Sequence, residues 1–148
     1  MKKQYHEYVL YGSLGIALLT LVITFGGLVL QRNSADQPVP QQGFMPIISG
    51  TTEQGDVSIE LKPLGVRDGK LVVNIAANTH SVDLSQFDLK QIARLEYEGK
   101  SASPFTAPVL SGHHSSGVLE FEVGKAPSKF TIKIKGIPAV DERVFVWK

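Results

Sequence analysis

The chain has 148 residues and no cysteine, and its 15 basic and 14 acidic residues give a formal net charge of +1. This length leaves room for one folded domain beside a membrane segment, and the balanced charge argues against nucleic acid as a partner. The absence of cysteine excludes disulfides and thiolate chemistry, so a domain outside the cytoplasm must be held together by its hydrophobic core.

The first predicted element is a transmembrane helix over residues 8–30, which contain no charged side chain. As a helix, residues 9–30 would be about 33 Å long, which matches a hydrocarbon core about 30 Å thick. A cleaved signal peptide is the alternative, but its apolar region would be about 7–15 residues long and would end at small residues. Because this stretch ends in Leu28-Val29-Leu30, we predict an uncleaved anchor.

The basic residues around this helix predict its orientation. Lys2 and Lys3 precede the helix, and Arg32 is the only basic residue soon after it. Positive charge favours the cytoplasmic side of a membrane. We therefore expect residues 1–7 in the cytoplasm and the C-terminal domain outside the plasma (inner) membrane.

One face of the predicted helix carries small or hydroxylated residues at helical spacing. These residues are Ser13, Ala17, Thr20, Thr24 and Gly27. Small faces let helix backbones approach closely, which predicts a partner transmembrane helix or a homodimer. The alternative is the ordinary composition of a membrane helix, whose Ser and Thr hydroxyls bond to their own backbone.

Residues 31–55 are predicted to form a flexible linker, because Gln, Pro, Ser and Gly dominate and little apolar surface can be buried. Within it, residues 44–48 read Phe-Met-Pro-Ile-Ile and are apolar. This segment either docks on the following domain or rests at the lipid interface, and docking is the simpler expectation.

From residue 56 onward, apolar and polar residues alternate with the period of β-strands. Residues 63–69 are expected to turn, with Asp68-Gly69 as the turn dipeptide. The alternation predicts strands at residues 57–62, 70–79, 92–98, 103–109, 117–123, 129–135 and 144–147. We therefore predict an all-β fold, an immunoglobulin-like antiparallel β-sandwich over residues 56–148. Its core should include Phe121, Phe130, Ile132 and Ile134.

Three of the four histidines lie in two short stretches of this domain, at His80 and at His113-His114. If every connection reverses direction and residues 103–109 cross the sandwich, both stretches lie at one end, together with Asp83. Imidazole nitrogens suit zinc, copper(II) and nickel, and a carboxylate can complete the ligand set. We therefore hypothesise a copper(II) or zinc site formed by His80, His113, His114 and Asp83. Asp88 and residues 141–143 should fall at the same end.

Adjacent histidines in a strand point to opposite faces, so one ion can bind both His113 and His114 only if residues 112–116 form a turn. Otherwise one histidine is a ligand and the other supports it. The alternative is a structural role, with His80 capping a strand end beside Asp83. Because His80, Ser81 and Asp83 are sequence neighbours and no G-x-S-x-G elbow is present, the pattern does not favour a catalytic triad, and we predict a protein that is not an enzyme.

Three stretches of the last part of the chain carry a resemblance. They are N-T-H-S-V-D-L at residues 78–84, G-H-H at 112–114 followed by G-V-L-E-F at 117–121, and the tail at 135–147. Together they resemble an uncharacterised group of small prokaryotic membrane-anchored or exported proteins. The resemblance implies a location at or beyond the membrane, and it implies no activity.

The sequence therefore predicts a membrane-anchored extracytoplasmic binding module that holds a metal ion through histidines. The alternative is a structural or interaction subunit of a membrane assembly with no ligand of its own. Metal content distinguishes these two functions.

The anchor can be tested on cell membranes. We expect the chain to remain in the membrane fraction after carbonate extraction, because a transmembrane helix is not held by electrostatics alone. Protease added from the outer side should cleave the C-terminal domain. A soluble mature form that begins near Ser34 would instead identify the apolar stretch as a signal peptide.

Overall fold

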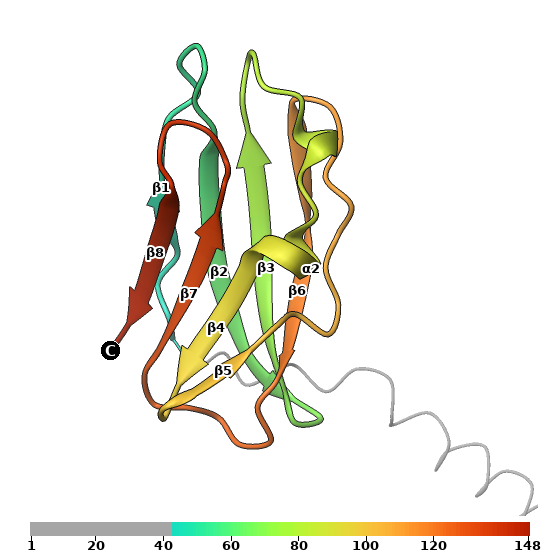
Figure 1. Cartoon of the computed structure of the whole chain (residues 1–148). Coiled ribbons are helices and arrows are strands. Elements are labelled where there is room, and N and C mark those ends of the chain that lie inside the picture. The colour runs from blue at the N-terminus through green and yellow to red at the C-terminus, as the bar shows by residue number, and fades with distance from the viewer. Residues whose placement is uncertain (1–42) are drawn as a thin grey trace, which may run out of the picture. The chain divides into compact units, whose positions relative to one another are not determined.

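The computed structural model describes residues 43–148, and the predictions made for residues 1–42 lie outside the described residues. Two four-stranded antiparallel sheets are stacked on each other (Figure 1). Sheet A has the order β1 (Ile47–Ser49), β2 (Ser58–Arg67), β3 (Lys70–Asn78), β6 (His114–Glu122). Sheet B has the order β5 (Lys100–Ala102), β4 (Ala93–Tyr97), β7 (Phe130–Lys135), β8 (Glu142–Trp147). The predicted all-β fold is confirmed.

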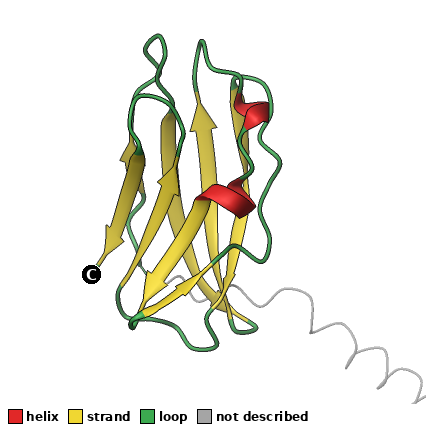
Figure 2. Ribbon diagram, in the orientation of Figure 1, coloured by secondary structure: helices red, strands yellow, loops and turns green. Residues whose placement is uncertain are grey.

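Helical structure within residues 43–148 is limited to two short turns between β3 and β4 (Figure 2). They are the 3₁₀ turn η1 (Leu84–Gln86) and the α-helical turn α2 (Leu89–Ile92). Neither turn, and no other helix of this part of the chain, has the length and apolar character needed to cross a membrane.

The core lies between the two sheets and follows from the alternation of apolar residues. Every second residue of β3 and β7 is buried, because successive side chains of a strand point to opposite faces. The predicted core residues Phe121, Phe130, Ile132 and Ile134 are at most 3% exposed. Sheet A supplies the first of these residues and sheet B the other three, so the core joins the two sheets.

The predicted turn over residues 63–69 is wrong in extent, because β2 continues to Arg67 and only Asp68-Gly69 turns. Both turn residues have positive φ, 50° and 75°, as a two-residue hairpin turn requires. Pro63 is tolerated inside β2 because the register with β3 shifts between Pro63 and Gly65, which is a bulge. On the other side of β2, strand β1 pairs only as far as Leu61. Pro63 lies beyond this point, so its missing N–H costs no hydrogen bond to β1.

The strand predicted at residues 103–109 is not formed. Only an isolated bridge joins Thr106 to Glu120 of β6, and Pro104 and Pro108 interrupt the segment. The segment still covers the edge of β6, because Pro108 packs against Gly117, where a Cβ would lie 2.4 Å from the proline ring. Proline supplies no N–H for a ladder, which explains why this segment follows the edge without forming a regular strand.

The apolar segment before the predicted domain docks on it. Ile47–Ser49 form β1 and pair with β2, and the Phe44 ring packs edge-to-face on Phe130 at 5.1 Å. The indole of Trp147 donates a hydrogen bond to the carbonyl of Met45 at 2.9 Å. Docking is therefore the alternative that the structure shows for these residues, and a fragment that begins at residue 50 would lack β1.

The core can be tested by truncating one side chain. Phe121→Ala in a fragment of residues 43–148 should lower the free energy of unfolding by about 3–5 kcal/mol, because the ring is fully buried and leaves a cavity. Urea unfolding followed by the fluorescence of Trp147, which is the only tryptophan, measures this loss. The control is Val118→Ala in the same strand, whose side chain is 37% exposed and should cost about 0.5 kcal/mol or less. Equal losses for both variants would contradict the inward direction of Phe121.

Candidate histidine site

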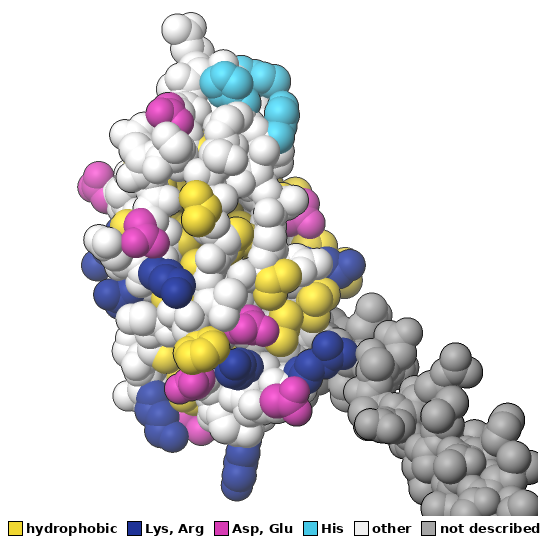
Figure 3. Space-filling model, turned by 90° about the vertical axis from the view of Figure 1, so that its right-hand side faces the viewer, with side chains coloured by type: hydrophobic (Ala, Val, Ile, Leu, Met, Phe, Trp, Pro, Cys, Tyr) yellow, Lys and Arg dark blue, Asp and Glu magenta, His cyan; other side chains and the backbone are white. Residues whose placement is uncertain are grey.

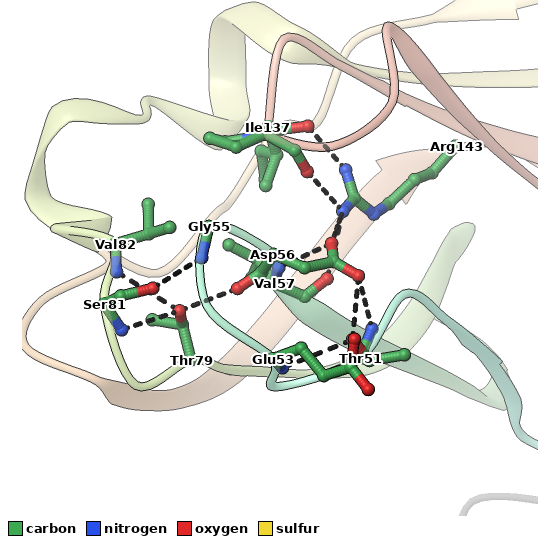
Figure 4. Close-up of polar contacts among 11 residues, drawn as sticks. Thr51, Glu53, Gly55, Asp56, Val57, Thr79, Ser81, Val82, Ile137 and Arg143 are labelled. Carbon is green, nitrogen blue, oxygen red and sulfur yellow. Dashed lines mark hydrogen bonds and ion pairs between the residues drawn. The ribbon is translucent and has the colours of Figure 1, made fainter.

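A buried arginine organises the end of the domain where β3 ends and β6 begins. Arg143 lies in β8 and is 2% exposed. Its guanidinium donates hydrogen bonds to the carbonyls of Ile137 (2.6 Å), Pro138 (2.7 Å) and Val57 (3.0 Å) and to Asp56 Oδ1 (3.0 Å) (Figure 4). These bonds join β8 of sheet B to the start of β2 in sheet A.

Asp56 is the charged partner that makes this burial tolerable. An unpaired buried charge is costly, whereas a charge with an ion-pair partner and several hydrogen bonds is not. Burial alone would raise the pKa of the Asp56 carboxyl, but hydrogen bonds from Thr51 and Val57 and the charge of Arg143 outweigh it, so this pKa lies below its ordinary value. Burial lowers the pKa of Arg143, and Asp56 opposes that change. The guanidinium therefore stays charged.

The backbone of Asp56 in turn fixes the loop that carries His80. The Thr79 hydroxyl is fully buried and donates to the Asp56 carbonyl at 2.7 Å. The same hydroxyl accepts from the amides of Ser81 (3.3 Å) and Val82 (3.2 Å) (Figure 4). Because this hydroxyl holds the backbone on both sides of His80, the position of the histidine is set by the start of β2.

The strand register brings His80 and His114 together. β3 and β6 are antiparallel neighbours with Asn78 opposite His114, and the Thr79 amide donates to the His113 carbonyl at 2.9 Å. The rings of His80 and His114 approach edge-to-face with their centroids 6.3 Å apart. Figure 3 shows the histidine side chains gathered at this end of the domain.

Asn78 fixes the orientation of the His114 ring. The Nδ1 atom of His114 lies 2.9 Å from Asn78 Oδ1. An amide oxygen can only accept a hydrogen bond, so this contact favours the tautomer with the proton on Nδ1, in which Nε2 is the nitrogen that can bind an ion. A hydrogen bond of this kind, to the nitrogen that does not bind the ion, is what orients metal-ligating histidines.

Asp83, the carboxylate predicted as a ligand, makes its hydrogen bonds within its own turn. Its side chain caps η1, accepting from the amide (2.9 Å) and the hydroxyl (2.7 Å) of Ser85. These two bonds, with a smaller contribution from the charge of His113, hold the pKa of the Asp83 carboxyl below its ordinary value. Asp88 likewise caps α2.

Within residues 43–148, no three side chains of His, Cys, Asp or Glu are grouped so that they could hold a metal ion. Of the four residues predicted as ligands, the structure brings together His80 and His114. His113 precedes β6 and contributes its carbonyl to the contact with β3. All three histidines are exposed, so their ring nitrogens are accessible to ions in solution.

Sequence reasoning missed the residues that position the histidines. Asn78 stands two residues before His80, and only the pairing of β3 with β6 shows that it faces His114. Asp56 and Arg143 lie 87 residues apart. A single arginine at the start of an otherwise apolar strand, R-V-F-V-W at residues 143–147, was the one signal that it could be buried.

Comparisons with family models, with curated proteins and with solved structures gave no match. The function is therefore argued from the geometry of this end of the domain.

The ion pair predicts a pH dependence of stability. The pKa of Asp56 is lowered in the folded state, so its contribution is complete above the unfolded value of about 3.9 and is lost as the pH falls through the folded value. Asp56→Asn should destabilise residues 43–148 by about 1–3 kcal/mol at pH 7, since it weakens a hydrogen bond to a buried charge. The difference from the native chain should shrink below about pH 4.

Urea unfolding at pH 7 and at several acidic pH values measures this difference. Glu53→Gln is the matched control, because Glu53 is an exposed carboxylate in the same loop. A destabilisation by Asp56→Asn that stays constant down to pH 2 would show that the charge of Asp56 does not stabilise the fold.

Proposed function

We propose that this protein is a membrane-anchored extracytoplasmic binding module whose β-domain holds one divalent transition-metal ion, copper(II) or zinc, between His80 and His114. The observation that carries the proposal is the close approach of these two rings. The His114 ring is oriented by the contact of its Nδ1 atom with Asn78, which leaves its Nε2 atom for an ion. Neutral imidazole is a preferred ligand for both ions.

The distance between the rings is compatible with a shared ion. Two imidazoles that each bind an ion at about 2.1 Å have ring centroids about 5–6 Å apart, depending on the angle at the ion. The observed distance is 6.3 Å. Both side chains are exposed, so buried neighbours do not oppose rotation of either ring toward an ion.

Two protein ligands define an open site. Structural zinc sites have four protein ligands, whereas sites that exchange ligands keep positions for water or for an incoming group. With His80 and His114 bound, the remaining positions are open to water or to donors of another protein. This arrangement suits a module that receives or passes on an ion, for example to a neighbouring transporter or redox protein.

The order of the strands supports an immunoglobulin-like sandwich. In that fold strands A, B, E and D form one sheet in this order, and C, F and G form the other. β2, β3 and β6 follow the order A-B-E, and β4, β7 and β8 follow the order C-F-G. The irregular segment at residues 103–109 lies against β6, the position that strand D takes against strand E.

Membrane attachment through residues 8–30, with the small-residue face as a contact for a partner helix, belongs to the same proposal. The described chain begins beside Phe130 and Trp147, where β7 starts and β8 ends. The histidines lie at the opposite end of the strands (Figure 1).

Ion binding can be measured on residues 43–148 without a histidine tag. Titration calorimetry with zinc and electron paramagnetic resonance with copper(II) should give one ion per chain with micromolar affinity and nitrogen ligands. His80→Ala and His114→Ala should each remove this binding, and His113→Ala is the matched control that should keep it. Acidification from about pH 7.5 to about pH 5.5 should weaken binding, because protons compete for the imidazole nitrogen.

The role of Asn78 gives a second test of the same site. Asn78→Ala should weaken ion binding about 10-fold or more, because the ring loses the bond that orients it. Asn78→Asp keeps an acceptor for Nδ1 and should restore most of the affinity. If the unmodified domain binds neither ion at micromolar concentration, the metal function is wrong. The interaction subunit without a ligand would then take its place, and the unpaired edge of sheet B described next is the observation that favours it.

A further inference from the structure

The strand β8 forms an uncovered edge of sheet B. It is hydrogen-bonded to β7 and to no other strand of residues 43–148. The other edge strands, β1 and β5, have three residues each, and the edge of β6 is covered at Thr106. β8 has six residues, and although it contacts β1, no ladder joins the two strands, so its outer backbone edge is unpaired among the described residues (Figure 1).

This edge lacks most of the features that usually prevent strand addition. Edge strands are commonly protected by proline, by a bulge, by a lysine or by an inward-pointing charged residue. β8 has the last of these, Arg143, whose guanidinium is bound to Asp56 and to backbone carbonyls. β8 has neither proline nor lysine between residues 142 and 147, and its register with β7 runs without a break over six residue pairs. Its inward side chains Arg143, Phe145 and Trp147 are at most 5% exposed, so the strand is packed against the interior of the domain.

The outward side chains of β8 are complementary to themselves. In order they are Glu142, Val144 and Val146, with Lys148 directly after the strand, and the two valines are 49% and 44% exposed. Within its own sheet Glu142 forms an exposed ion pair with Lys135 of β7 at 3.5 Å. An antiparallel pair of β8 strands centred on Phe145 places Val144 opposite Val146 of the second copy. The same register places Glu142 opposite Lys148 at both ends. Opposite charges and β-branched pairs across strands are favourable.

Other registers lose this match. A pair centred on Val144 sets Glu142 against Val146 and leaves Lys148 without an opposite residue. A pair centred on Val146 sets Lys148 against Val144 and leaves Glu142 without one. A register shifted by a single residue would set the outward side chains of one copy opposite the inward side chains of the other copy. Charge and shape therefore favour the register centred on Phe145.

We propose that β8 pairs with β8 of a second copy of this chain, antiparallel and centred on Phe145. The two B sheets then form one continuous sheet across a two-fold axis, and the interface is isologous, with the same residues on both sides. The backbone N–H and C=O groups of the free edge gain partners. Met45 is 76% exposed beside the end of β8, and it adds apolar surface next to this contact.

The absence of cysteine allows a direct test in the full chain. In the proposed register Val144 and Val146 of two copies face each other at a Cα distance of about 4.5–5.5 Å, which a disulfide can bridge. We expect membranes that contain both Val144→Cys and Val146→Cys chains, with different tags, to give disulfide-linked heterodimers under mild oxidation. Membranes that contain only one of the two variants should give at least 10-fold less disulfide-linked dimer. Val109→Cys mixed with either variant is the control for random collision, since Val109 is 88% exposed and follows Pro108, which packs against β6 of the other sheet.

A charge exchange tests the register independently. Glu142→Lys places lysine opposite Lys148 and should reduce the mixed crosslink at least 5-fold, and the combination with Lys148→Glu should restore it. A mixed crosslink no stronger than the Val109→Cys control would overturn the proposal, even if the chains remain dimeric through their membrane segments. Strong crosslinking of Val144→Cys or Val146→Cys with itself would overturn the register centred on Phe145.

Discussion

The structure depends most on the burial of one charged group, the guanidinium of Arg143. Its bonds to Asp56 and to three carbonyls hold β8 of sheet B against the start of β2 in sheet A. Of its nitrogens, only Nε lacks a partner among the described residues. The position of Gly50 also depends on this packing, because a side chain there would lie 2.2 Å from the Val57 carbonyl and 3.2 Å from the guanidinium. Loss of the Asp56 charge would leave the guanidinium buried without its charged partner, which is far more costly than loss of a surface pair.

The histidine end is built on this interaction in two further steps. The carbonyl of Asp56 holds the Thr79 hydroxyl, and that hydroxyl holds the turn with His80. The other half of the site comes from β6, where the register with β3 sets His114 opposite Asn78. An exposed pair of imidazoles is thereby held by backbone anchored on the buried Thr79, while the rings themselves remain in water. Rigid support with accessible ligands is the combination that an exchangeable ion site requires.

The candidate site was predictable in part. The sequence predicted that His80 and His113-His114 lie at one end, on the assumption that residues 103–109 cross the sandwich. These residues do follow the length of β6, although as an irregular segment. The group that orients a ring, Asn78, could not be predicted, because Asp83 was the nearest carboxylate in sequence, and its Oδ1 accepts both of its hydrogen bonds from Ser85 within its own turn. Local hydrogen bonds of this kind compete with longer-range ones, and a sequence does not show which will form.

The sequence by itself determined the local structure of the domain. Alternation of apolar residues marks the inward face of each strand, and Asp68-Gly69 marks a tight hairpin, because both depend only on neighbouring residues. Only the tertiary structure decided that β1 joins sheet A, that β6 lies beside β3, and that Arg143 is buried against a carboxylate 87 residues away. The physical reason is the distance along the chain over which each feature is specified. A strand is specified by its own residues, whereas its neighbour, its register and the partner of a buried charge are specified by how all the apolar faces are buried at once.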